Sequence, residues 1–63
     1  MKFKEFDTVR IMVGKYNDIK CNDIGVVIMA FDSPNEAYEI EIVSDDGKTI
    51  AQGVFLPTEI ELA

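Results

Sequence analysis

Acidic residues occur in pairs along the chain, and paired carboxylates are the groups that glycosidases use for acid–base chemistry. The pairs are Glu39/Glu41, Asp45/Asp46 and Glu59/Glu61. Glycoside hydrolysis needs two carboxylates on opposite sides of a cleft, one of them with a raised pKa. Glu39 and Glu41 are two residues apart in an alternating segment, so their side chains project from the same strand face. We therefore expect them to form a solvated acidic face.

Metal binding and nucleophilic catalysis have little support among the residue types present. Asp18, Asp23, Asp45 and Asp46 could offer oxygen ligands to a hard cation, but the spacing of a calcium loop is absent. The chain has no histidine and one cysteine, Cys21, so a zinc site is not expected and the thiol has no histidine as a base. We expect no catalytic residue, no metal ion and no cofactor, and thus no enzyme.

Three aromatic residues near predicted loops could line a peptide-binding groove. Peptide-binding SH3 domains receive Pro-rich ligands between exposed aromatic side chains, and the candidates here are Tyr16, Phe31 and Phe55. The chain has no tryptophan, two tyrosines and four phenylalanines, which would make such a groove poor. Core packing or loop anchoring is the alternative role for these side chains.

Length and charge restrict the classes of protein and partner. A chain of 63 residues predicts one domain, residues 1–63, that buries only about 60% of its unfolded surface. Twelve acidic and six basic residues give a net charge of −6 and leave no basic stripe for phosphates, so we expect no nucleic-acid partner. A basic protein partner fits this charge, although acidity could also serve only to keep a small protein soluble.

The sequence also predicts a cellular location. One cysteine cannot form an internal disulfide, which favours a reducing compartment. The first residues contain no long apolar run, so we expect no signal peptide. No segment approaches the roughly 20 apolar residues that cross a bilayer. We expect a cytoplasmic protein with no membrane partner.

The elements that position these residues begin with a hairpin over residues 37–54. Tyr38, Ile40 and Ile42 alternate with Glu39 and Glu41, which is the pattern of a half-buried strand.

The turn of this hairpin is formed by residues 45–47, with Gly47 at a position of positive φ. A three-residue loop would set Ile42 opposite Ile50. A two-residue turn at Asp46-Gly47 would set Ile42 opposite Ala51, and the sequence leaves both registers open.

Three further segments have the pattern of short strands. Residues 7–13 form the first, with Val9, Ile11 and Val13 facing the core. Residues 26–31 are apolar almost throughout, which is typical of a strand covered on both faces or bent between two sheets. Residues 60–62 alternate and should pair with the first strand. Outside the strands, we expect Phe3 and Phe6 to pack on the barrel, Tyr16 and Ile19 to anchor the loop 14–23, and Gly25 to mark a bulge or tight bend.

These elements together predict an all-β fold. Five short strands without an amphipathic helix fit a five-stranded SH3-like barrel, with one short 3₁₀ turn at residues 57–59 before the last strand. Closing the sheet would remove its exposed edges. An edge left open by the short last strand could pair two copies, so a homodimer is one expectation.

Several short motifs resemble a family of small bacterial proteins, the domain-of-unknown-function family 4926. The motifs are Asp7-Thr-Val-Arg-Ile, Asp23-Ile-Gly25-Val-Val, Ala37-Tyr38-Glu-Ile-Glu, Asp46-Gly47-Lys-Thr-Ile-Ala51, Leu56-Pro57 and Ile60-Glu-Leu62. The similarity spans nearly the whole chain and implies an SH3-like barrel without transferable catalytic residues. The resemblance is also compatible with an antitoxin or immunity role. A more distant resemblance to KOW-type domains implies an RNA- or ribosome-associated module, which the missing basic residues disfavour.

We therefore expect a small non-enzymatic binding module that docks a basic protein through an acidic face. The candidate partner-binding residues are Asp32, Glu36, Glu39, Glu41, Asp45, Asp46 and Tyr16. An accessory barrel that packs an apolar patch against an enzyme complex is the alternative, and a KOW-like RNA module is a further one.

Overall fold

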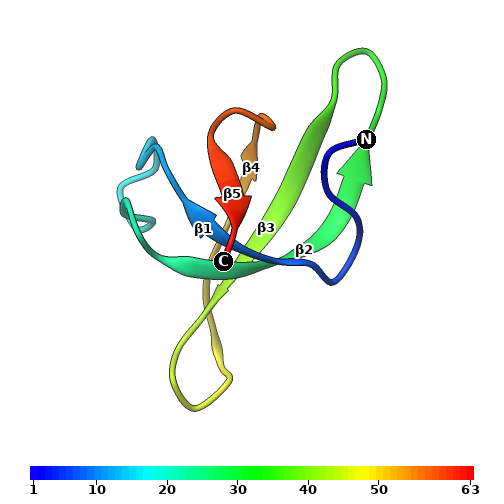
Figure 1. Cartoon of the computed structure of the whole chain (residues 1–63). Helices are drawn as coiled ribbons and strands as arrows, with labels where there is room; N and C mark the ends of the chain where they lie inside the picture. Colours follow the sequence, from blue (N-terminus) through cyan, green and yellow to red (C-terminus); the bar gives the residue numbers. More distant parts are fainter.

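The computed structural model describes all 63 residues as one curved antiparallel sheet without a helix (Figure 1). Its strands are β1 (Thr8–Ile11), β2 (Ile24–Phe31), β3 (Ala37–Val43), β4 (Thr49–Phe55) and β5 (Ile60–Leu62). The expected all-β class and the five strands are thus confirmed, with the strand ends shifted by up to two residues. No helix has the length and apolar character needed to cross a membrane.

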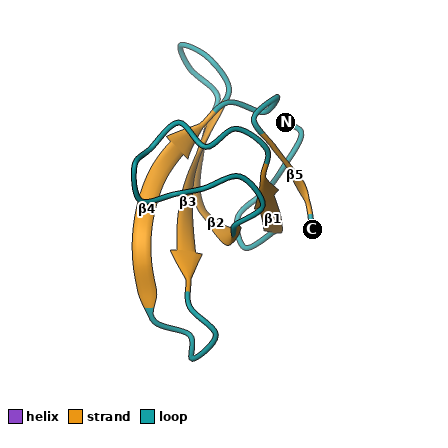
Figure 2. Cartoon of the chain, turned by 90° about the vertical axis from the view of Figure 1, so that its left-hand side faces the viewer, coloured by secondary structure: helices purple, strands orange, loops and turns teal.

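The strand order in the sheet is β4-β3-β2-β1-β5. Figure 2 shows β2 between β3 and β4 on one side and β1 and β5 on the other. The expected return of the last strand to the first is confirmed, since β5 pairs antiparallel with β1. The outer strands β4 and β5 do not pair with each other, so hydrogen bonding does not close the sheet.

The core lies on the concave side of the sheet, where alternating residues of β1, β2 and β3 meet. Fully buried side chains include Val9, Val27, Tyr38 and Ile40. Burial of each large apolar side chain contributes about 1.5–3 kcal/mol to the free energy of unfolding, so these buried side chains are a main source of stability. The opposite residues of β3, Glu39 and Glu41, remain partly exposed, as the alternation predicts.

Two expected core contacts are wrong. Val13 lies beyond the end of β1 and is exposed, because the strand stops at Ile11. Phe6 is 78% exposed, whereas Phe3 is buried as expected. Phe6 has φ +72 in a turn that the Asp7 N–H closes on the Lys4 carbonyl (3.1 Å), and this conformation directs its ring to solvent.

The strand β2 bends at a bulge instead of at Gly25. The pairing with β3 shifts between Val27 and Met29, which leaves Ile28 as the extra residue. Gly25 instead allows a close approach to β3, because a Cβ there would lie 2.6 Å from Ile40 Cγ2 and 2.8 Å from the Glu41 carbonyl oxygen.

The hairpin between β3 and β4 combines features of both expected registers. Gly47 has φ +84 and its N–H bonds the Ser44 carbonyl (2.9 Å), while the Ser44 N–H bonds the Lys48 carbonyl (2.9 Å). This is a three-residue loop with a left-handed glycine. A second irregularity between Ile42 and Val43 then sets Ile42 opposite Ala51 and leaves Ile50 exposed.

The segment between β4 and β5 is a single turn at residues 57–58. The turn is closed by the hydrogen bond from the Glu59 N–H to the Leu56 carbonyl (2.9 Å). In the other direction, the Leu56 N–H donates to the Glu59 carboxylate (2.8 Å). The structure assigns no 3₁₀ helix here. A single bond of the i to i+3 type defines a turn, and a 3₁₀ helix needs a second one beside it, from Thr58 to Phe55 or from Ile60 to Pro57, which is not formed.

Candidate functional site

The outward side of β3 carries the two central acidic candidates, Glu39 and Glu41. Strand pairing places Glu39 between Met29 of β2 and Val54 of β4. It places Glu41 between Val26 and Gln52 in the next row. Cross-strand neighbours on one face have Cβ atoms about 4.5–5.5 Å apart, so these side chains form one surface. We call this surface, residues 26, 29, 31, 39, 41, 52 and 54, the β3 outer face.

Three apolar side chains of the β3 outer face are exposed. Met29 is 47% exposed, Val54 41% and Phe31 36%. Sequence reasoning placed Phe31 in a possible aromatic groove but did not single out Met29 or Val54. The apolar run of β2 is a signal for Met29, because a strand buried on one face leaves its alternate apolar residues outside; Val54 lies on β4 and has no such signal.

The two carboxylates on this face have different surroundings. The Gln52 side-chain amide donates a hydrogen bond to the Glu41 carboxylate (Nε2 to Oε2, 3.3 Å). The ion pairs of the protein join Arg10 to Glu61 and Lys15 to Glu59, so neither reaches Glu39. No side-chain hydrogen bond of the protein involves the Glu39 carboxylate either; the carboxylate on this face that accepts one belongs to Glu41. Its charge therefore stands uncompensated between Met29 and Val54.

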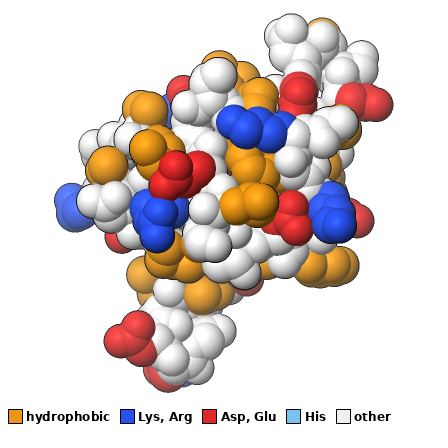
Figure 3. All heavy atoms as spheres, viewed as in Figure 1, with side chains coloured by type: hydrophobic (Ala, Val, Ile, Leu, Met, Phe, Trp, Pro, Cys, Tyr) orange, Lys and Arg blue, Asp and Glu red, His pale blue; other side chains and the backbone are white.

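The other acidic candidates lie at the two ends of β3. Asp32 belongs to the loop from β2 to β3, and Asp45 and Asp46 belong to the loop from β3 to β4. These loops project in opposite directions, and acidic atoms gather at both tips in the space-filling view (Figures 1 and 3). The structure therefore spreads the expected acidic strip along the whole length of β3.

Asp46 is part of the turn. Its carboxylate accepts hydrogen bonds from the Ser44 hydroxyl and the Lys48 N–H (3.3 Å). The Ser44 hydrogen bond is the main cause that lowers the pKa of Asp46.

Glu36 holds the N-terminal segment against the sheet. Its carboxylate accepts hydrogen bonds from the Tyr38 hydroxyl and from the Lys2 N–H (2.9 Å). The Tyr38 hydrogen bond is the first cause that lowers the pKa of Glu36. Burial, and then the Glu36 bond, raise the pKa of Tyr38. These bonds engage Glu36 within the protein.

Tyr16 lies at the free edge of β4, where its hydroxyl bonds the backbone of Val54, the residue of β4 that pairs with Glu39. Its ring packs edge-to-face on Phe55 (5.4 Å between centroids) and beside Gly53. Its hydroxyl donates to the Val54 carbonyl (2.9 Å) and accepts from the Val54 N–H (3.0 Å). Tyr16 anchors its loop, as one alternative predicted, and Ile19 is buried beside it. Because Phe55 is buried and Phe31 lies on the β3 outer face, no groove joins the three aromatic candidates.

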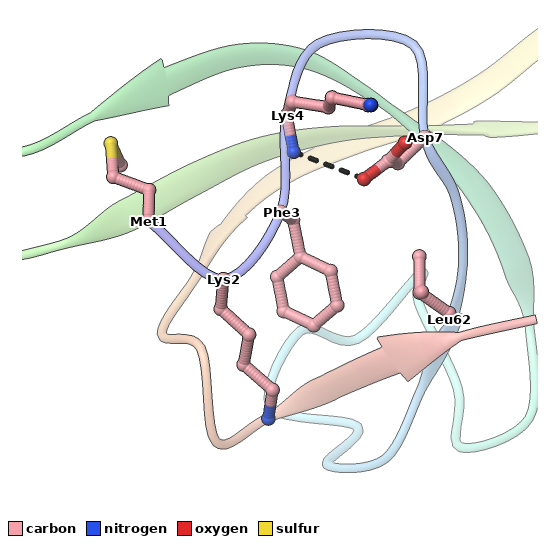
Figure 4. Close-up of a pocket in the computed structure, with 6 residues that line it drawn as sticks. All are labelled: Met1, Lys2, Phe3, Lys4, Asp7 and Leu62. Atoms are coloured by element: carbon pink, nitrogen blue, oxygen red, sulfur yellow. Dashed lines mark hydrogen bonds between the residues drawn. The ribbon is translucent and has the colours of Figure 1, made fainter.

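A shallow pocket of about 380 Å³ lies at the N-terminal segment, which sequence reasoning missed (Figure 4). It is lined by Met1, Lys2, Phe3, Lys4, Asp7 and Leu62. Phe3 forms its wall and stacks edge-to-face on Tyr38 (5.2 Å). The Asp7 carboxylate accepts the Lys4 N–H (3.0 Å) and serves the local turn. These side chains include no nucleophile with a base.

Elsewhere in the protein, few side chains could support catalysis or metal binding. No group of three or more His, Cys, Asp or Glu side chains could hold a metal ion. Cys21 is exposed, and its thiol donates a hydrogen bond to the Met12 carbonyl (3.4 Å). Burial raises the pKa of Glu59, but the hydrogen bonds from the Lys15 ammonium and from the Leu56 N–H together outweigh burial, so the pKa is lowered. The β3 outer face is therefore the candidate functional site.

Comparison with known proteins identifies no relative of this chain. No family model, no curated protein and no solved structure matches it significantly.

Proposed function

We propose that this protein is a small non-enzymatic binding module whose β3 outer face docks a basic protein. The observation that carries the proposal is the Glu39 carboxylate, which has no internal partner and stands between the exposed side chains of Met29 and Val54. A charge and apolar surface side by side are the two components of specific protein interfaces. The net charge of −6 favours a basic partner and would speed its association at low salt.

The subtype that we propose is an antitoxin or immunity protein that masks the active site of a basic toxin. The proposed fold family is the SH3-like barrel, and the proposed sequence family is the domain-of-unknown-function family 4926. The strand order and the bulged β2, which is long enough to be shared by two halves of a barrel, support the barrel. The single exposed thiol of Cys21 fits a reducing cytoplasm.

A second candidate is an accessory subunit of an enzyme complex. The exposure of Met29, Phe31 and Val54 favours it, because an assembly subunit buries such side chains permanently against a larger partner. The salt dependence of partner binding distinguishes the two functions. Screening weakens an interface that depends on charge, whereas an apolar interface persists.

Affinity capture of the tagged protein from its own host tests the proposal. The protein is bound at low salt, washed at high salt, and the eluates are identified by mass spectrometry. A stoichiometric basic protein released by the wash supports the inhibitor function and identifies its target. A stoichiometric partner retained through the wash favours the accessory subunit, and recovery of the bait alone contradicts both.

A further inference from the structure

We infer that the β3 outer face recognises an arginine side chain of the partner, bound at Glu39 with its aliphatic stem against Met29 and Val54. This inference rests on the proposed function and deepens it, since it specifies the group that makes the central contact. It is carried by the row Met29–Glu39–Val54, in which a single carboxylate lies between two exposed apolar side chains.

The occupant of this face has to bring positive charge. A second copy of the chain docked face to face would bring its own Glu39 and Glu41 to the same surface, and the two rows that contain them, Met29–Glu39–Val54 and Val26–Glu41–Gln52, hold no basic residue. Two such carboxylates would repel each other as the interface lost water. The charge on the β3 outer face therefore argues against self-association here and for a cationic partner.

Arginine fits this surface better than lysine for two reasons. Its guanidinium is planar and weakly hydrated, so it loses less on entering a partly apolar surface than the compact ammonium of lysine. Its N–H groups can also reach two carboxylate oxygens at once, and its methylene groups can lie along apolar side chains. Glu41, about 7 Å further along the same strand face, can take a second N–H or a neighbouring basic residue.

The acidic loop tips act at longer range. Asp45 lies beyond the end of β3 at Val43, and four strand residues already separate that end from Glu39 by about 13 Å. This distance exceeds the Debye length of about 8 Å at physiological salt. A residue in contact with Glu39 is therefore insensitive to removal of the Asp45 charge, which makes Asp45→Asn a matched control for Glu39→Gln.

Titration of the ¹⁵N-labelled protein with three short peptides tests the inference by NMR. The peptides are acetylated and amidated Val-X-Val sequences, in which X is arginine, lysine or citrulline, the neutral analogue of arginine. We expect the arginine peptide to shift the amides of residues 26–31, 37–41 and 52–54, with a Kd at least threefold lower than that of the lysine peptide. The citrulline peptide should bind at least tenfold more weakly than the arginine peptide.

Variants complete the test. Glu39→Gln should weaken binding of the arginine peptide at least fivefold, and Asp45→Asn should leave its Kd unchanged. Equal affinity for the arginine and lysine peptides at this face would overturn the inference while the proposed function stood. Shifts confined to residues 44–48 would overturn the assignment to Glu39. The absence of shifts with the arginine peptide would contradict the inference, whereas the proposed function is contradicted only if affinity capture also recovers the bait alone.

Discussion

Gly47 shows how strongly a single residue can determine the hairpin. It has φ +84, and a Cβ at this position would meet no atom within 4 Å. A substitution here therefore changes backbone strain without a steric clash. Gly47→Val should lower the free energy of unfolding by about 1–2 kcal/mol, since a β-branched residue resists the left-handed conformation.

Thermal denaturation checks this expectation. In a domain of this size, each kcal/mol corresponds to a change in Tm of about 4–8 °C. Gly47→Asn is the matched control, because asparagine tolerates positive φ and should lose much less. An unchanged Tm in the valine variant would mean that the loop does not need a left-handed residue.

Carboxylates held by hydrogen bonds give the protein a defined response to acid. The pKa values of Glu36, Asp46 and Glu59 are lowered in the folded chain, so these groups stabilise the fold above their unfolded pKa values. That stability is lost as the pH falls through the folded pKa values. With no histidine to titrate, we expect Tm to be flat between about pH 5 and 8 and to decline below about pH 4.

Glu36→Gln isolates one contribution to this acid response. The carboxylate accepts the Tyr38 hydroxyl and the Lys2 N–H, and a glutamine at this position cannot gain a proton as the pH falls. The variant should have a lower Tm at pH 7 and a shallower decline of Tm at acid pH, measured by circular dichroism. If Tm fell in parallel with pH in the wild-type protein and in Glu36→Gln, the Glu36 carboxylate would not contribute to the acid response.

At the scale of elements, one tyrosine side chain, that of Tyr16, hydrogen-bonds the backbone at the free edge of β4. The Tyr16 hydroxyl makes hydrogen bonds to both backbone groups of Val54, which otherwise face solvent at the sheet edge. Tyr16→Phe keeps the packing on Phe55 and removes only these bonds. We expect a loss of about 0.5–1.5 kcal/mol in the free energy of unfolding and faster hydrogen exchange at the Val54 amide. Unchanged exchange at Val54 would show that the hydroxyl does not protect the edge.

The elements were predictable where one face is buried and the chain alternates. The pattern from Tyr38 to Ile42 predicts the strand β3 and the face on which each of these residues lies, because a half-buried strand requires a period of two. The bulge at Ile28 and the exposed turn at Phe6 were not predictable, since each depends on pairing with a distant segment. The hairpin register needed both the glycine turn and a second irregularity, and a local sequence specifies only the first.

The candidate site was predictable in part for the same reason. Alternation places Glu39 and Glu41 on the outward face, which the structure confirms. Their neighbours Met29 and Val54 come from other strands, so they become visible only when the register is known. The internal bonds of Glu36 and the position of Tyr16 likewise depend on tertiary contacts.

At the scale of the whole molecule, charge and exposed apolar surface occur together. The chain has a net charge of −6, and Met29, Phe31 and Val54 lie exposed beside its central carboxylates. Repulsion among the acidic groups disfavours self-association of this face, while the apolar side chains favour a partner. We therefore expect added salt to weaken partner binding without abolishing it.

The central claim is that the β3 outer face binds a basic partner, and the affinity of the captured partner for two matched variants tests it most directly. Glu39→Lys with Glu41→Lys reverses two charges on this face. Asp32→Lys with Asp45→Lys makes the same change in net charge at exposed positions in the two loops that flank β3.

Calorimetry at a fixed salt concentration measures both affinities, and thermal denaturation confirms that both variants fold. We predict at least a tenfold loss of affinity for the first variant and less than a threefold loss for the second. Equal losses in the two variants, or full binding by the first, would contradict the claim.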